Sequence, residues 1–191
     1  EQLSTLRVIP GMSVWRPSDV TETAISWKSS LEKLNGPSSL VLTRQTLPEL
    51  KRSKAQIKSI AKGGYILQDC SQKIDAILLS SGSETHLCLD AADKLKDGGL
   101  EIRVVSVPCL EEFLSQPKSY QNKVIPDDFD NILAVEAGIG VCWDKLIGKK
   151  GIKITMDSFG VSAPGDKALK YFGFTTSNVI KQTKKLIKKN G

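Results

Sequence analysis

Arg44 is the residue whose type and position most directly suggest chemistry. An apolar run at residues 40–42 is followed by Thr43 and this arginine, and Pro48 then bounds a turn. Such a run predicts a strand, and ligands bind at the carboxyl ends of strands in parallel α/β sheets. A guanidinium group can hold a phosphate with two parallel hydrogen bonds. Arg44 is therefore a candidate phosphate-binding residue, although arginines at strand ends also often form surface ion pairs.

A serine- and glycine-rich segment, residues 80–84, joins an expected strand to an expected helix. Backbone amides at a helix start attract anions, so the segment could hold a phosphate. It lacks the glycine spacing of a dinucleotide-binding loop and the lysine of a P-loop. The structural interpretation is favoured: Ser81 or Ser83 caps the helix, and Glu84 lies in its first turn.

A second segment, residues 135–140, places Glu136 at an expected strand end, followed by Gly138 and Gly140. This carboxylate could bind a ligand or meet a partner subunit, but the structural interpretation is again favoured. Because a buried carboxylate must find hydrogen-bond donors, we expect backbone amides at a helix start to supply them.

No other group of residues predicts catalysis or metal binding. His86 is the only histidine and is expected to be a partly exposed helix residue. Residues 158–165 predict a flexible loop entering a helix at Pro164, and Ser162 lacks the neighbours of a serine nucleophile. No carboxylates cluster at metal-ligand spacing. From the residues alone we predict no catalytic residue, no cofactor-binding residue and no metal ligand.

Composition and charge exclude several classes of protein. The 191 residues are 40% hydrophobic, which is enough for a core, and no apolar run is long enough to cross a membrane. The net charge of +6 is divided between segments of opposite sign, so no continuous basic surface is expected. The lysines of residues 181–189 are interpreted as the solvated face of an amphipathic helix. The four cysteines are expected to be buried free thiols in a reducing cytosol. The start at Glu1 suggests a domain or a processed product.

Alternating strand-like and helix-like stretches predict an α/β fold with crossover helices. A strand at residues 12–16 precedes a helix whose start is marked by Asp19 and Glu22, at capping-box spacing. The helix is expected to end near residue 33, and a strand at residues 38–43 follows it. Its apolar stripe is expected to be buried: Ala24, Trp27, Leu31 and Leu34.

Residues 46–62 interrupt this alternation with charged side chains and an early proline, so they are predicted to be a linker. The pattern then resumes, with strands expected at 65–67, 76–80, 102–107, 132–135 and 152–155 and helices at 84–96, 110–114, 141–146, 165–172 and 177–189. These elements predict a three-layer α/β/α domain over residues 63–191, with a mainly parallel sheet of about five strands. Residues 1–45 are interpreted as a partial α/β unit at the end of a preceding domain.

Eight motifs, in order and with consistent spacing, resemble those of transketolases. They are RPSDVTET (16–23), LTRQTLP (42–48), KGGYILQD (62–69), SSGSE (80–84), RVVSVP (103–108), VEAG (135–138), DSFGVSAP (157–164) and YFGFTTSNV (171–179). The resemblance covers essentially the whole chain. It implies that residues 1–45 end the pyrimidine-binding middle domain and that residues 63–191 form the carboxyl-terminal domain.

The resemblance also implies the activity of a longer parent enzyme. Transketolases are cytoplasmic homodimers that use thiamine diphosphate and a divalent cation, Mg or Ca. They move a two-carbon ketol unit from a ketose phosphate to an aldose phosphate in the pentose phosphate pathway. In the family an arginine of the LxRQ motif holds the sugar phosphate, and Arg44 falls on that position. The carboxyl-terminal domain is expected to support the subunit interface without supplying a catalytic residue.

The chain also departs from the family pattern. It has no GDG…N metal motif and no cofactor-activating glutamate in its family context. It also lacks the active-site histidines of the family, since His86 does not match any of them. We therefore expect this chain alone to bind no cofactor and to be inactive. Two alternatives remain: a related enzyme such as dihydroxyacetone synthase, or a non-catalytic module that holds an anion or a partner through residues 81–84 or 136–140. Neither a nucleic acid nor a membrane is an expected partner.

Overall fold

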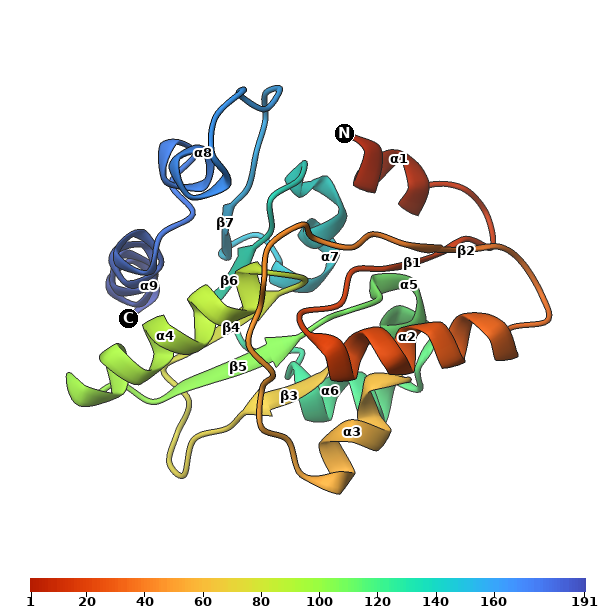
Figure 1. Cartoon of the computed structure of the whole chain (residues 1–191). Helices are drawn as coiled ribbons and strands as arrows, with labels where there is room; N and C mark the ends of the chain where they lie inside the picture. Colours follow the sequence, from red (N-terminus) through yellow and green to blue (C-terminus); the bar gives the residue numbers. More distant parts are fainter.

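A five-stranded sheet forms the centre of the molecule, which a computed structural model describes over all residues 1–191 (Figure 1). Its spatial order is β3-β5-β4-β6-β7; β4, β5, β6 and β7 run parallel, and β3 pairs with β5 antiparallel. The strands are β3 (Tyr65–Gln68), β4 (Ala76–Ser80), β5 (Ile102–Ser106), β6 (Ile132–Val135) and β7 (Ile152–Ile154). The predicted mainly parallel sheet of about five strands is confirmed.

Helices cover both faces of this sheet and enclose two apolar cores. On one face α4 (Glu84–Asp97) and α9 (Thr176–Asn190) lie side by side (Figure 1). Their core includes Leu78, Leu95 and Leu186. On the other face Phe113 and Trp143 pack against Ile77 and Leu79. The elements there are α5 (Leu110–Ser115), α6 (Lys118–Val124), the 3-10 helix η1 (Gly140–Trp143) and α7 (Asp144–Ile147). Helix α8 (Gly165–Tyr171) precedes α9, and the three-layer prediction is confirmed.

The amino-terminal elements form a small separate unit. They are α1 (Gln2–Arg7), β1 (Ser13–Trp15), α2 (Val20–Glu32) and β2 (Ser38–Leu40). β1 and β2 pair in parallel as a two-stranded sheet. This unit contacts the loops after the parallel strands: the Arg16 amide donates to the Pro108 carbonyl at 2.7 Å, and the Gly82 amide donates to the Arg16 carbonyl at 2.9 Å.

Helix α2 packs with the opposite face to the one predicted. Asp19 caps it as expected, accepting a hydrogen bond from the Glu22 amide at 2.9 Å. However, its buried side chains are Glu22 and Ser26, and the predicted stripe is exposed. Trp27 is 52% exposed, and Leu31 and Leu34 are more exposed still. The prediction was wrong because the stripe has no covering element in this chain, while Glu22 finds polar partners on the sheet side.

Three helices were not predicted from the sequence: α1, α6 and α3 (Lys54–Ile60). Helix α3 lies inside residues 46–62, the segment that was predicted to be a linker. Ser53 and Gln56 form a reciprocal capping box at its start, and Ile60 is fully buried beside Tyr65. One buried side chain and a good cap stabilise a helix that its sparse apolar pattern did not indicate.

Candidate functional site

Arg44 lies in an exposed loop rather than at a strand end. Strand β2 ends at Leu40, where its pairing with β1 ends, so the predicted extension to residue 43 was wrong. The Arg44 side chain is exposed and makes no ion pair. The other four arginines of the chain all bind carboxylates: Arg7, Arg16, Arg52 and Arg103. Arg44 is thus the one arginine of the chain without a carboxylate partner.

The loop that carries Arg44 borders a groove between the amino-terminal unit and the sheet domain. The groove has a volume of about 330 Å³, and its lining includes Thr43, Gln45, Ser83 and Leu169. The Gln45 side-chain amide donates to Ser83 Oγ at 3.1 Å, which ties the loop to the start of α4. The position of the loop therefore depends on the sheet domain as well as on β2.

Glu136 is the centre of a buried cluster of charges. Its carboxylate is fully buried and accepts two hydrogen bonds from Arg7, both at 2.7 Å. Ser81 Oγ donates to it at 2.6 Å and the indole of Trp143 at 2.8 Å. Burial alone would raise the pKa of this carboxyl, but Arg7, the charge of Arg16 and the Ser81 bond lower the pKa to about 2. Side chains, not the expected helix-start amides, are its donors.

The segment at residues 80–84 holds a second arginine. Arg16 Nη1 donates to the Ser81 carbonyl at 2.6 Å and also bonds to the Glu84 carboxylate. The Ala137 amide donates to Glu84 at 3.1 Å. Ser83 is the N-cap residue of α4 and Glu84 lies in its first turn, as predicted, although Ser83 makes no side-chain capping hydrogen bond. The segment therefore binds the Arg16 guanidinium group, and the Gly82 amide is bonded to the Arg16 carbonyl.

A third cluster joins α2 to the sheet through Arg52. This arginine donates to Asp19 at 2.5 Å and to the Tyr65 hydroxyl at 2.6 Å. Tyr65 and Ser106 in turn each donate to Glu22 at 2.7 Å. The pKa of Tyr65 is raised, mainly by burial of its hydroxyl and in second place by the charge of Glu22. Sequence reasoning found Asp19 and Glu22 only as local caps, because nothing in the sequence pairs them with residues this far away.

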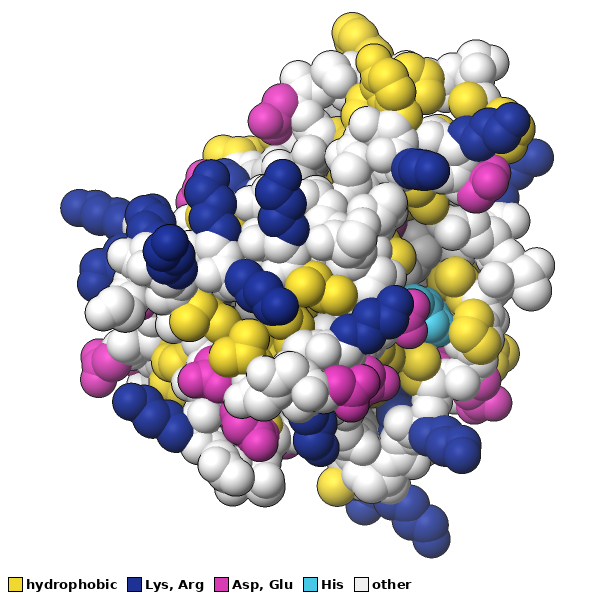
Figure 2. All heavy atoms as spheres, turned by 90° about the vertical axis from the view of Figure 1, so that its left-hand side faces the viewer, with side chains coloured by type: hydrophobic (Ala, Val, Ile, Leu, Met, Phe, Trp, Pro, Cys, Tyr) yellow, Lys and Arg dark blue, Asp and Glu magenta, His cyan; other side chains and the backbone are white.

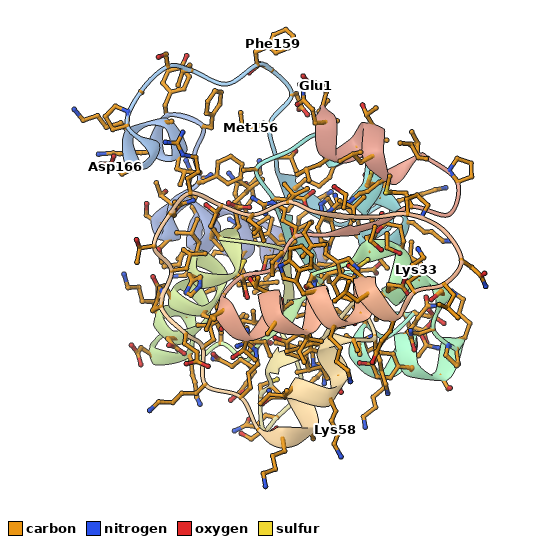
Figure 3. The ribbon with its side chains drawn as sticks, turned by 45° about the vertical axis from the view of Figure 1, so that its right-hand side comes forward. Glu1, Lys33, Lys58, Met156, Phe159 and Asp166 are labelled. Carbon is orange, nitrogen blue, oxygen red and sulfur yellow. The ribbon has the colours of Figure 1, made fainter.

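The remaining candidates have structural roles. His86 is partly exposed, as predicted, with Nε2 3.0 Å from the Ser18 carbonyl oxygen. The loop of residues 158–165 is exposed, and Figure 3 shows Phe159 at its tip, pointing away from the body of the molecule. The cysteines are free, but Cys70 and Cys142 are only partly buried. Burial raises the pKa of the Cys88 thiol to about 12, so it is not a nucleophile at neutral pH.

The lysines of α9 face solvent, as predicted. Figure 2 looks onto the side of α4, α8 and α9 and shows lysines there mixed with acidic and apolar side chains. Val179, Thr183 and Leu186 form the buried face of α9. No helix of the molecule has the length and apolar character needed to cross a membrane.

The residues present do not fit thiamine diphosphate or its metal. No three histidine, cysteine, aspartate or glutamate residues are grouped so that they could hold a metal ion. The two buried carboxylates of the amino-terminal unit, Asp19 and Glu22, are already bonded within the third cluster.

The fold and the site define a doubly wound α/β domain joined to a partial α/β unit, with one free arginine in the loop after β2. Two family models match this sequence. The transketolase-like C-terminal domain matches residues 63–175, and the transketolase pyrimidine-binding domain matches residues 1–49. The chain belongs to the transketolase family.

Curated relatives and solved structures agree with this assignment. Transketolase 2 of Escherichia coli (strain K12) is 43% identical over 187 residues, covering 98% of this chain and 28% of the relative. The transketolase of Buchnera aphidicola subsp. Acyrthosiphon pisum is 45% identical over 188 residues, with the same coverage. This chain thus spans less than a third of the length of those relatives.

Solved structures match over nearly the whole chain. The transketolase of Leishmania mexicana has a TM-score of 0.90 and 36% identity, covering 99% of this chain and 27% of that one. A Pichia stipitis transketolase in complex with sedoheptulose-7-phosphate has a TM-score of 0.88 and 36% identity, and the match covers 97% of this chain and 26% of that one. A split-gene transketolase described as an inactive β4 tetramer shares the fold, at a TM-score of 0.73 and 22% identity.

Proposed function

We propose that this chain is the carboxyl-terminal part of a transketolase, and that Arg44 binds the phosphate of its sugar substrates. The parent enzyme transfers a two-carbon ketol unit from a ketose phosphate to an aldose phosphate, using thiamine diphosphate and a divalent cation in a cytoplasmic homodimer. Residues 1–45 form the end of its pyrimidine-binding domain, and residues 63–191 form its carboxyl-terminal domain. Residues 46–62 are the linker between these two domains. This chain by itself is inactive, because its residues cannot hold the cofactor.

One observation carries the proposal for Arg44: it is the only arginine of the chain whose guanidinium group has no carboxylate partner. An unpaired guanidinium can form both parallel hydrogen bonds to a phosphate without first breaking an ion pair. Binding a phosphate far from the reacting carbonyl would position the sugar for carbon–carbon bond cleavage. The relative crystallised with sedoheptulose-7-phosphate supports a phosphorylated sugar as the ligand.

The test compares Arg44→Ala with unchanged protein in the full-length parent enzyme. We expect the KM for xylulose 5-phosphate to rise about 10- to 100-fold, because the variant loses a pair of charge-assisted hydrogen bonds to the phosphate. The KM for an unphosphorylated ketol donor should stay within about twofold, since the lost bonds involve only the phosphate. Arg44→Lys should lie between the two, because lysine keeps the charge but not the paired geometry.

Lys51→Ala is the matched control, since Lys51 is another exposed cation close in sequence. It should leave the KM of both donors unchanged. An equal loss for phosphorylated and unphosphorylated donors would contradict the phosphate-binding role. A parent enzyme that transfers ketol units but does not use ribose 5-phosphate as the acceptor would favour the related-enzyme alternative, such as dihydroxyacetone synthase.

A further inference from the structure

The order of the strands creates a crevice at one place in the sheet domain. From β4 the chain crosses through α4 to β5 on one side, and β6 then pairs with the other side of β4. The strand order therefore reverses between β4 and β6, and doubly wound folds bind their ligands outside the carboxyl ends of such strands. In this molecule the loops at that place contain Ser81, Gly82 and Glu136, and Glu84 is the first residue of α4.

Two guanidinium groups of the amino-terminal unit occupy this crevice. Arg7 bonds to both oxygens of Glu136, and Arg16 bonds to Glu84 and to the carbonyl and hydroxyl of Ser81. The side chains of Arg7 and Glu136 are 2% and 0% exposed. Gly82 makes room for this approach: a Cβ added there would lie 2.5 Å from Arg16 Nη1. The absence of a side chain at Gly82 thus leaves the space that Arg16 occupies.

The charges of the crevice select a cation rather than an anion. Its own side chains contribute two buried carboxylates, Glu84 and Glu136, and the two arginines balance them. A buried carboxylate without a partner is unstable, so Glu84 and Glu136 each need a positively charged partner. Both oxygens of Glu136 face Arg7 at 2.7 Å, a geometry that a planar guanidinium matches and an ammonium does not.

We propose that the crevice between β4 and β6 is a guanidinium-binding site, which takes its two ligands from the same chain and thereby docks residues 1–16 on the sheet domain. If Arg7 is shortened, the emptied site binds free guanidinium ion. Inorganic phosphate does not bind there, because Glu84 and Glu136 would repel it. The anion-holding function considered for residues 81–84 and 136–140 is replaced by the binding of a cation.

The experiment uses the indole of Trp143 as a reporter, because it donates to the same Glu136 carboxylate at 2.8 Å. Its NMR cross-peak is assigned with Trp143→Phe, which removes one of three indole signals. Guanidinium chloride is titrated into the Arg7→Ala chain up to about 100 mM, against the same concentrations of sodium chloride, a range suited to millimolar affinity. Arg103→Ala is the matched control, since it breaks an arginine–carboxylate pair at the surface.

We expect a saturable movement of the Trp143 cross-peak toward its original position in Arg7→Ala, and none in the unchanged chain or in Arg103→Ala. A folded Arg7→Ala chain whose Trp143 signal does not respond saturably would overturn the proposal. If Arg7→Ala unfolds, low guanidinium should restore its dispersed spectrum, and a failure to do so counts equally against it. A saturable phosphate-induced shift of the Ser81 or Gly82 amides in the unchanged chain would also overturn it.

Discussion

Helix α9 and the segment of residues 1–16 are held on the same sheet domain by different forces. The helix buries Leu186 and its apolar neighbours, and its lysines remain in solvent. The segment buries Val14 and Trp15 and is also held by two guanidinium groups bonded to Glu136 and Glu84. Apolar burial is non-directional and tolerates small shifts, whereas a buried ion pair requires its one partner. The attachment of the amino-terminal unit should therefore be sensitive to charge, and that of α9 should not.

The largest effect that would sharpen this contrast is expected from Arg52→Ala. It leaves the buried carboxylates of Asp19 and Glu22 without their cation, which should lower the free energy of unfolding by about 3–5 kcal/mol. Arg103→Ala, which breaks the pair with the half-exposed Asp69, should cost less than about 1 kcal/mol. Urea unfolding of both variants measures the difference. Equal costs would mean that burial of the ion pair contributes nothing.

The next largest effect is expected from acid, which should weaken the charged attachment but not the apolar one. The pKa of Glu136 is lowered from 4.5 to about 2 in the folded state, so its stabilisation is fully present above the unfolded pKa. It is lost as the pH falls from about 5 toward 2, an effect on the order of 3 kcal/mol. Glu136→Gln should remove this part of the pH dependence. Leu186→Ala should lower stability by about 3 kcal/mol but keep the pH profile of the unchanged chain.

In that comparison, urea unfolding of each chain is followed at several pH values. A Glu136→Gln chain that loses stability in acid as steeply as the unchanged chain would contradict the assignment of this dependence to Glu136.

The smallest effect is expected on the exposed face of α2. Because Trp27, Leu31 and Leu34 are already in solvent, a Leu31→Gln/Leu34→Gln chain should differ in stability by less than about 0.5 kcal/mol. Urea unfolding checks this value. A loss of several kcal/mol would show that the face is covered in solution.

The sequence predicted the elements of the sheet domain well because their patterns are local and strong. The apolar runs of β4 and β6 and the stripe of α9 are each buried by other parts of this chain. The stripe of α2 was equally regular, yet it is exposed. Periodicity therefore indicates which face of a helix is apolar, but not whether the chain contains the surface that would cover it.

The partners of the candidate site could not be predicted in the same way. Glu136 and residues 80–84 were recognised as notable, but Arg7 lies 129 positions away from Glu136 and has no motif of its own. An ion pair depends on the crossing of distant segments, which a single sequence does not reveal. The expectation for Arg44 came from a strand end and a family motif. The strand is shorter than predicted, and the phosphate-binding role stays a proposal.

The central claim, that buried charge pairs hold the amino-terminal unit, is tested most directly by a double-mutant cycle on Arg7 and Glu136. Arg7→Met and Glu136→Gln should each lower the unfolding free energy by about 3–5 kcal/mol. The first leaves Glu136 without its paired hydrogen bonds to a cation, and the second leaves Arg7 only the longer contact with Glu111. The double variant removes both charges, and the glutamine oxygen can still accept from Trp143 while its amide group donates to the Ser81 hydroxyl. It should cost at least about 2 kcal/mol less than the sum of the two. Single costs below about 1 kcal/mol that simply add would contradict the claim.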